Sequence, residues 1–273
     1  MALRIQNNVE AFNAHRNLSW TEGKLGTSME RLSSGYRINR AADDAAGLAI
    51  SERLRGQIGG LAQSQRNVQD AVSLVQTAEG SLTEVHAMLQ RVRELAVQYK
   101  NGSLSSADRV AIQSEVYQLA SEIERIGSSA EFNGIKLLNV AQTISFQVGA
   151  RDGETITVST ISLGNLATAG GVGTAYFALS SVQNSDISEI DVALDNVSAQ
   201  RAAYGAVQNR LEYTQTNAAI YEENLTASES RIRDVDMAAQ MVEFTKLQIL
   251  QSAGTSMLAQ ANQSSQGVLS LLR

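Results

Sequence analysis

The sequence contains no cysteine and no proline, and it has few aromatic residues. The lack of cysteine excludes disulfides, thiolate metal sites and thiol catalysis. The lack of proline suits long uninterrupted helices, because a proline inside a helix costs about 3 kcal/mol. Aromatic residues make up only 5% of the chain. This composition favours narrow seams between helices over a broad globular core.

Motifs that carry enzymatic chemistry are also missing. His15 and His86 stand alone on expected helices, and no HExxH pattern for a zinc protease occurs. There is no Walker A loop and no GxGxxG pattern. Histidine and aspartate show no convergent spacing, so metal and nucleophilic sites have little support. The sequence therefore argues against an enzyme and predicts no cofactor and no metal.

Charge and hydropathy limit the partners. The formal net charge of −6 argues against general binding to nucleic acid or to acidic membranes. No segment approaches the roughly 20 apolar residues that a membrane-spanning helix needs, so no membrane insertion is expected. The stretch from Met1 to Trp20 holds no apolar run fit for a secretory signal. Composition alone thus predicts a cytosolic protein, unless export uses another route.

A long row of apolar residues organises the chain, and its steps alternate between four and three with a gap only at Gln65. Its members are Leu54, Ile58, Leu61, Val68, Val72, Val75, Ala78, Leu82, Val85, Leu89, Val92, Ala96 and Tyr99. This spacing places them on one side of a helix, as in a coiled-coil seam. The two successive steps of three from Val72 to Ala78 indicate a stammer. A rod of about 70 Å cannot bury its own stripe, so other parts of the chain or other chains must cover it.

Helices are also expected before and after this row. Residues 1–32 form an amphipathic helix of moderate quality, and Gly35 marks a break after it. Asp43 and Asp44 are placed as the cap and first-turn carboxylates of the long helix. Beyond that helix, Asn101-Gly102 indicates a turn, and a capping box is expected at Ser105 with Asp108. The next helix, 106–128, has a seam in strict four–three spacing and runs antiparallel to the first; the seam is Ile112, Val116, Leu119, Ile123 and Ile126.

The middle of the chain carries the clearest β signal. Apolar and polar residues alternate around Phe146 and Val158, and Asp152-Gly153 supplies the turn of a hairpin over 143–159. Residues 131–139 are interpreted as a turn with an apolar tail. Residues 160–185 are rich in glycine, alanine, serine and threonine without periodicity, and a loop or short irregular structure is expected there.

Helical periodicity returns from Asp186 onward, with apolar residues at Ile187, Ile190, Leu194, Val197, Tyr204, Leu211, Ala218, Leu225 and Ile232. Polar residues share this register at Arg201, Gln208, Gln215, Glu222 and Glu229. Either the partner surface supplies polar groups, or the seam drifts onto Ala203, Val207 and Ile220. The last segment, from Met237, is again amphipathic. The expected fold is mainly α: a long antiparallel helical coiled-coil bundle, with the termini paired at one end and a small β-hairpin region near the middle of the chain.

Apolar stripes reach both ends of the chain, where one chain offers little surface to cover them. Such ends often order only when copies assemble. Contacts between unlike surfaces whose rotation does not close produce an open helical filament. The sequence therefore favours a protein that polymerises through its ends.

Several long motifs resemble those of bacterial flagellins, the short Bacillus-like ones most of all. They are RLSSGYRINRAADDAAGLAISERLRGQIGGL (Arg31–Leu61), QRVRELAVQ (Gln90–Gln98), EFNGIKLL (Glu131–Leu138), GAVQNRLEYT (Gly205–Thr214), ENLTASESRIRDVDMAAQMVEFTK (Glu223–Lys246) and MLAQANQSSQGVLSLLR (Met257–Arg273). The resemblance covers nearly all of 1–140 and 186–273. It implies a structural subunit that polymerises into the flagellar filament for motility.

The resemblance also implies a division into parts. Residues 1–43 and 234–273 would form an inner-core coiled coil, and residues 44–140 and 186–233 a helical spoke. Residues 141–185 would be the β-hairpin with a short variable insert, and no large outer domain remains. The implied location is extracellular, in the flagellum, after export without a cleaved signal through the flagellar type III channel. Implied partners are further copies of the chain, the flagellar cap and hook-junction proteins, and the flagellin export chaperone.

Two sets of site residues follow from matching motifs. Some flagellins are sensed by Toll-like receptor 5 through the helix that bears QRVRELAVQ, which here points to Gln90, Arg91, Glu94, Leu95 and the neighbouring Glu115. Alternatively, the charged members make contacts between subunits and Leu95 widens the apolar stripe. Polymerisation and chaperone binding are implied for the ends; the residues are Ile5, Val9, Phe12, Met257, Leu258, Val268, Leu269, Leu271 and Leu272. The last three leucines also resemble the part that intracellular inflammasome sensors detect.

Two alternatives stay open at the level of sequence. A hook–filament junction protein of the same flagellum shares the start of the chain but usually matches less well after it. A cytoplasmic coiled-coil adaptor would explain the helices, yet not the apolar stripes at both extreme ends.

Overall fold

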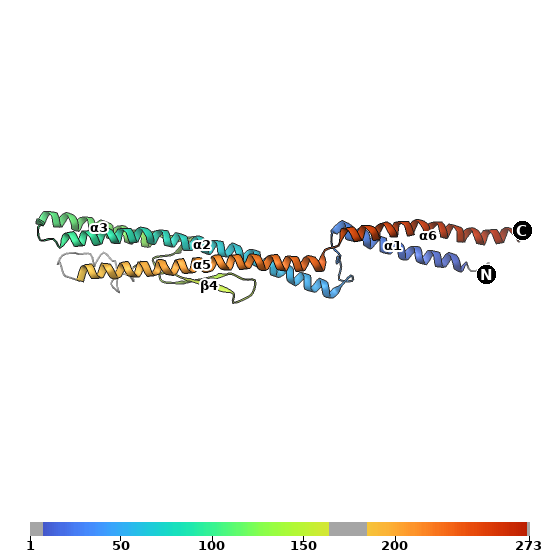
Figure 1. Cartoon of the computed structure of the whole chain (residues 1–273), viewed down its shortest axis with the longest axis horizontal. Coiled ribbons are helices and arrows are strands. Elements are labelled where there is room, and N and C mark those ends of the chain that lie inside the picture. The colour runs from blue at the N-terminus through green and yellow to red at the C-terminus, as the bar shows by residue number, and fades with distance from the viewer. Residues whose placement is uncertain (1–7, 164–184, 272–273) are drawn as a thin grey trace. The chain divides into compact units, whose positions relative to one another are not determined.

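The computed structural model describes residues 8–163 and 185–271, with the side chains of 185–186 and 264–271 left aside. This part of the chain forms five α-helices and two short antiparallel hairpins (Figure 1). The helices are α1 (Val9–Ser34), α2 (Ala45–Tyr99), α3 (Ser106–Ser129), α5 (Ser185–Arg233) and α6 (Met237–Leu271). The strands are β1 (Glu131–Phe132), β2 (Ile135–Lys136), β3 (Thr143–Gln147) and β4 (Thr155–Ser159). The mainly helical fold class is confirmed.

Two compact units share the chain. Unit 1 comprises Met1–Gly56 and Asn224–Arg273, and unit 2 comprises Gln57–Glu223. The divisions fall within the residue ranges of α2 and α5. The functional boundaries at 43/44 and 233/234 stay a prediction.

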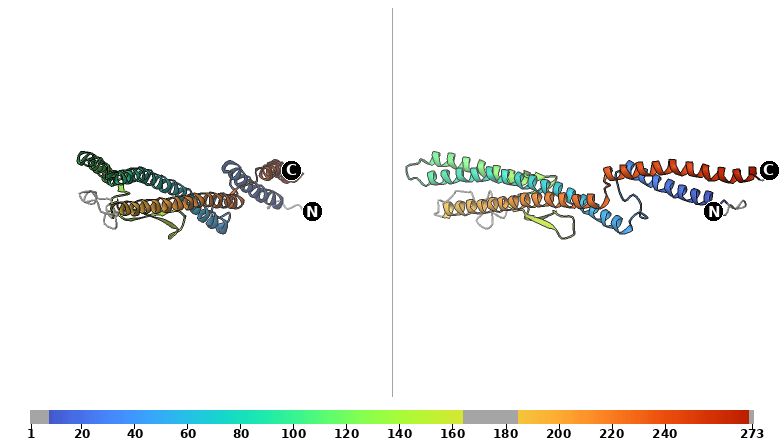
Figure 2. Two further views of the ribbon diagram at one scale, coloured as in Figure 1. Left: turned by 60° about the vertical axis from the view of Figure 1, so that its left-hand side comes forward. Right: turned by 45° about the vertical axis from the view of Figure 1, so that its right-hand side comes forward.

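Unit 2 is built on the long apolar row of α2. From Val68 to Tyr99 the predicted residues are buried, except for the partly buried Val72. Three further residues of α2, namely Ala71, Leu74 and Leu95, belong to the same core. The stripe is wider than one seam because α3 and α5 lie on either side of α2 (Figures 1 and 2). Ion pairs tie α2 to both neighbours, from Arg91 to Glu115 at 2.8 Å and from Arg93 to Asp191 at 2.5 Å.

The neighbouring helix α3 has the expected seam. Ile112, Val116 and Ile123 are buried, and Leu119 and Ile126 pack against them. The capping box at its start is confirmed, since the Ser105 hydroxyl accepts a hydrogen bond from the Asp108 N–H while the Asp108 carboxylate accepts one from the Ser105 N–H. These bonds satisfy backbone donors that the first turn leaves unpaired.

The returning helix α5 keeps the heptad register read from the sequence. Five buried residues follow one another at intervals of seven: Ile190, Val197, Tyr204, Leu211 and Ala218. The alternative seam is wrong for Ile220, which is 54% exposed, and for Ala203, which is also exposed; its third member, Val207, packs against the core. The polar residues on the register are half-buried instead. One of them, Glu222, accepts a 2.7 Å hydrogen bond from Gln65, the residue that interrupts the row on α2.

Both hairpins belong to unit 2. Strands β3 and β4 pair in antiparallel register from Thr143↔Ser159 to Gln147↔Thr155, and Gly153 has a φ of +87° in the turn. This confirms the expected hairpin, which buries Ile156 and Val158. The small β1–β2 hairpin was expected only as a turn. Its Asn133-Gly134 step has positive φ at both residues, the signature of a tight hairpin turn. The loop expected over 160–185 falls for the most part outside the described residues.

Unit 1 pairs α1 with α6, side by side in every view and with opposite chain directions (Figures 1 and 2). Asn8 caps the start of α1, and Gly35 ends it with a φ of +76°. Asp44 caps α2 by accepting a bond from the Gly47 N–H. The prediction for Asp43 is wrong: its carboxylate accepts bonds from the N–H groups of residues 39 and 40 and so orders the preceding loop.

The connection after α1 (residues 35–44) and the connection before α6 (residues 234–236) pair in antiparallel directions. The Arg37 N–H donates to the Arg233 carbonyl at 2.7 Å, and the Val235 N–H donates to the Gly35 carbonyl at 3.0 Å. The Arg233 guanidinium lies 4.8 Å from the centre of the Tyr36 ring and pairs with Glu52 at 2.6 Å. Hydrogen bonds and a cation–π contact therefore join the two connections, and the ion pair links Arg233 to α2.

Candidate assembly surfaces

The buried residues of the seam between α1 and α6 are mostly small or polar, and only one of them is a large apolar residue. The buried residues of the two helices are Thr21, Ser28, Gln240, Leu247 and Ala261. The Gln240 side-chain amide donates to the Ser28 hydroxyl at 2.7 Å, and the Asn8 amide donates to the Ala261 carbonyl at 2.8 Å. Because only a few apolar side chains are buried, hydrophobic stabilisation of this pair is small.

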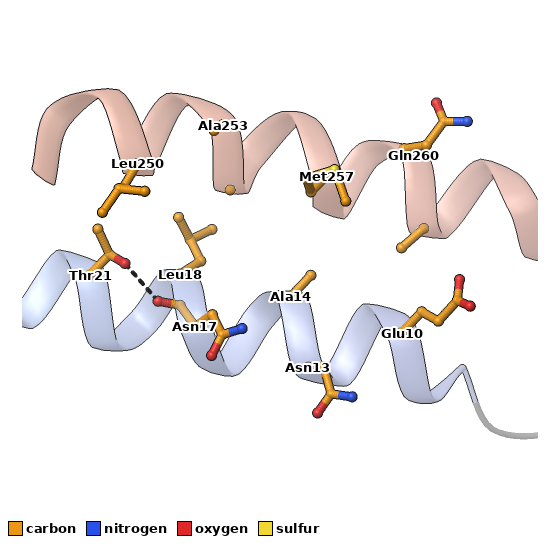
Figure 3. A pocket seen from close by; sticks show the side chains of 12 residues that line it. Glu10, Asn13, Ala14, Asn17, Leu18, Thr21, Leu250, Ala253, Met257 and Gln260 are labelled. Carbon is orange, nitrogen blue, oxygen red and sulfur yellow. Dashed lines mark hydrogen bonds between the residues drawn. The ribbon is translucent and has the colours of Figure 1, made fainter. Parts of the chain in front are cut away.

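A groove of about 640 Å³ lies between the same two helices, and Figure 3 shows Leu18 of α1 and Leu250 of α6 pointing toward each other across it. Met257 and Ala14 line it farther along. A methyl group added at Gly254 would lie 3.3 Å from Leu18, so the helices approach closely at that point. The groove leaves apolar side chains accessible between helices that already pack together.

Large apolar side chains are also exposed along both helices. We call this set the end surface; it consists of Val9, Phe12, Trp20, Met29, Met237, Met241, Val242, Ile249, Leu250 and Met257. Its members are 44–72% exposed. A run of exposed apolar side chains of this extent marks an interaction surface. Association through such a surface is favourable because it removes the apolar side chains from water.

The sequence identified part of the end surface. Val9, Phe12 and Met257 are 58%, 70% and 65% exposed, whereas Leu258 is half-buried. Trp20, Val242 and Ile249 were missed, although each stands outside the apolar rows assigned to intramolecular seams. The remaining predicted residues lie outside the described side chains; they are Ile5, Val268, Leu269, Leu271 and Leu272.

A second candidate surface lies on α2 and α3, and we call it the lateral surface; it consists of Gln90, Arg91, Glu94 and Glu115. Arg91 donates two hydrogen bonds to Glu115, at 2.8 and 3.0 Å, and one to Glu94 at 3.3 Å. The hydrogen bonds that Arg91 donates to Glu115 and, with a smaller effect, to Glu94 raise the pKa of Arg91. Gln90 contacts the His86 ring nitrogen Nε2 at 3.0 Å. The structure thus brings Arg91, Glu94 and Glu115 together, whereas the Gln90 side chain contacts His86.

Leu95 does not belong to the lateral surface. Its side chain is 2% exposed and packs in the core of unit 2. This is the alternative that the sequence left open for it, a widening of the apolar stripe.

Two negative findings concern the described residues only. They contain no group of three or more histidine, cysteine or acidic side chains arranged to hold a metal ion. None of their helices has the length and apolar character that a membrane span requires.

Comparisons with known proteins agree with this arrangement. Residues 5–143 match the bacterial flagellin N-terminal helical region, and residues 187–272 match the bacterial flagellin C-terminal helical region. A flagellin of Halalkalibacterium halodurans is 50% identical over 270 residues, which cover 98% of this chain and 99% of that protein. A flagellin of Bacillus subtilis is 47% identical over 306 aligned residues, covering 99% of this chain and 100% of that protein.

A solved structure shares the fold. It is that of a putative flagellar hook-associated protein from Vibrio parahaemolyticus, with a TM-score of 0.59 and 17% identity over 70% of this chain and 100% of that chain. At this level of identity the likeness concerns the fold alone.

Proposed function

The chain belongs to the bacterial flagellin family and is a structural subunit of the flagellar filament; on that premise we propose which of its surfaces build the filament. The end surface of α1 and α6 makes the contacts that drive polymerisation. One observation carries this proposal: ten large apolar side chains of α1 and α6 are 44–72% exposed, while the buried residues of the α1–α6 seam are mostly small or polar, with Leu247 as the one large apolar member.

A single copy covers the end surface only in part. Val242, Ile249 and Phe12 are 72%, 65% and 70% exposed. Burial by a neighbouring copy would supply the corresponding part of the roughly 1.5–3 kcal/mol that full burial of such a side chain contributes. Assembly would therefore stabilise the α1–α6 pair by mass action. Because unlike surfaces of successive copies meet, the product is an open helical filament.

Different parts of the chain form different parts of the filament. Residues 1–43 and 234–273 form the inner-core coiled coil of the filament. Residues 44–140 and 186–233 form the helical spoke, and residues 141–185 contribute the hairpin and a short variable insert. The exposed apolar side chains in the first part and the continuous core in the second support this division.

The lateral surface serves contacts between subunits and, on free subunits, contact with Toll-like receptor 5. Arg91 and Glu94 are 51% and 70% exposed at their side chains, and Glu115 is 45% exposed. Exposed ion pairs of this kind contribute little to the stability of one chain, so their charges are available to a partner at low cost. The buried Leu95 is excluded from this contact in the folded subunit.

Further partners extend the proposal beyond the filament itself. The flagellar cap and hook-junction proteins contact the ends of the growing polymer, and the export chaperone covers the C-terminal helix before secretion. The chain reaches the cell exterior through the flagellar type III export channel. These assignments rest on membership of the family.

The experiment that tests the end surface is seeded elongation with purified subunits. Val242→Asp places a carboxylate on α6 at a side chain that is 72% exposed, so the monomer should fold normally. Burying that carboxylate between copies is costly, and elongation should stop. Val110→Asp makes the same change at a 65% exposed valine of α3 and serves as the matched control. Elongation by Val242→Asp at the wild-type rate would refute the proposal.

A further inference from the structure

The methionines divide unequally between the two units. Of the six in the chain, four lie on α1 and α6 with exposures of 48–65%; they are Met29, Met237, Met241 and Met257. Met88 of α2 instead packs against the core of unit 2. Methionine is among the residues most often found buried. Four half-exposed thioethers in one helix pair are therefore an unusual surface.

Three of these thioethers lie on one side of the α1–α6 pair. Met237 and Met241 are four residues apart on α6 and share a helix face. The hydrogen bond between Ser28 and Gln240 shows that Ser28 and Gln240 lie opposite each other in the seam. In an antiparallel pair of right-handed helices, the next residue on each helix points to the same side of the pair. Met29 follows Ser28 and Met241 follows Gln240, so these two methionines share one side.

The fourth thioether has a different position on the same unit. Met257 lines the groove between the helices, where Figure 3 shows it beside the space enclosed by α1 and α6. All four belong to the end surface. An agent that modifies exposed thioethers would therefore act on the same side chains that assembly would bury.

We propose that these four methionines form a peroxide-sensitive modification site, whose oxidation prevents the free subunit from joining the filament. The inference rests on the proposed role of the end surface. In the reaction, a sulfur lone pair attacks one oxygen of hydrogen peroxide; the S–O bond forms as the O–O bond breaks. The sulfur is oxidised by two electrons to the sulfoxide, and the peroxide is reduced to water after a proton moves to the departing oxygen.

Oxidation changes the chemistry of the surface without changing the fold of the subunit. A sulfoxide is polar and chiral where the thioether was apolar and flexible. On the free subunit the new S=O group accepts hydrogen bonds from water, because these side chains are already exposed. Burial against another copy would strip that water without supplying a donor, which is unfavourable. Subunits already in a filament would be protected, since their thioethers would be covered.

The test compares wild-type subunits with the quadruple variant Met29→Leu, Met237→Leu, Met241→Leu and Met257→Leu. Leucine and methionine have similar volumes, so the exchange preserves an apolar surface. Both proteins are treated with hydrogen peroxide as monomers, the peroxide is removed, and seeded elongation is measured. Peptide mass spectrometry reports which methionines gained an oxygen. Methionine sulfoxide reductases then reverse the modification.

We expect the four methionines to be oxidised before Met88, and treated wild-type subunits to lose elongation and to recover it after reduction. The treated variant should elongate at the same rate as the untreated variant. Equal loss of elongation in the variant would overturn the inference, as would normal elongation by wild-type subunits with all four sulfoxides formed. A separate measurement tests the proposed function. If the end surface does not drive polymerisation, Val242→Asp subunits will elongate seeds normally without any peroxide treatment.

Discussion

Unit 2 and unit 1 use the same helical architecture with opposite placement of their apolar residues. In unit 2, leucine, valine and isoleucine from α2, α3 and α5 meet in one continuous core together with the β3–β4 hairpin. In unit 1, the seam buries Ser28 and Gln240, while Phe12 and Val242 lie in water. A core of the first kind stabilises a chain by itself, because its apolar surface is already removed from water.

The difference indicates that folding and assembly are assigned to separate stretches of one chain. Unit 2 needs no second copy to bury its apolar residues. Unit 1 keeps most of its apolar surface for contacts with other copies, at the expense of its own stability.

Leu89→Asp should destabilise unit 2 severely. Leu89 is fully buried in the α2 seam, and an unpaired carboxylate there has neither water nor a counter-charge. We expect a loss of about 4 kcal/mol or more in the free energy of unfolding, measured by denaturant titration of the monomer. The control is Val97→Asp on the same helix, where the side chain is 51% exposed and the change should stay within about 0.5 kcal/mol. Equal stability of the two variants would show that the seam is misplaced.

Limited proteolysis of free monomer should distinguish the units. Segments with few buried apolar contacts open with lower free energy than those in a continuous core. Protease should therefore cut within α1 and α6 first and leave the helices of a fragment from about residue 45 to 230 intact. Mass spectrometry of a time course identifies the order of the cuts. Cleavage within α2 or α5 as early as within α1 would contradict the contrast.

Ser105→Ala should have a moderate effect within unit 2. It removes the side-chain half of the capping box at the start of α3, and loss of such a cap costs about 1 kcal/mol. Ser106→Ala changes the adjacent exposed serine, which is not the cap, and is the matched control. Thermal unfolding followed by circular dichroism compares the two. A cap that contributes nothing would leave both melting temperatures equal.

Glu52→Gln should reveal a small, pH-dependent contribution in unit 1. The hydrogen bond from Arg233 lowers the pKa of Glu52 below its usual value of 4.5. Folding therefore favours the ionised carboxylate, so its contribution is present near neutral pH and disappears as the pH falls through the lowered pKa. Wild-type protein should melt at a higher temperature than Glu52→Gln at about pH 7, and this difference should shrink as the pH falls below 4.5 and through the lowered pKa. A difference independent of pH would exclude the ion pair as its cause.

Much of this contrast was predictable from spacing alone. The rows on α2, α3 and α5 follow the helical period, and the β3–β4 hairpin follows strict alternation around an Asp-Gly turn. The burial of Ala71 and Leu74 could not be read from one row, because it depends on α2 having a neighbour on each side. The Asn133-Gly134 hairpin was missed although its turn signal is strong, since the strands that flank it are only two residues long.

The candidate surfaces were predictable to a lesser degree. Gln90, Arg91 and Glu94 share a motif on one helix, but their meeting with Glu115 depends on how α3 packs. Leu95 belongs to the same motif and yet points into the core. For the end surface, the sequence indicated which helices are apolar, and not which of their faces the pairing of α1 with α6 would leave exposed.

Helical period, capping residues and turn dipeptides are local properties, so the sequence by itself determined the helices, their seams and the hairpin of the middle region. Which apolar residues remain in water is a property of packing, because a side chain is exposed only if no other element covers it. Phe12 and Leu89 are equally apolar in the sequence. Only the tertiary structure shows that Leu89 is already buried within the subunit, whereas Phe12 is exposed and available for another copy to cover.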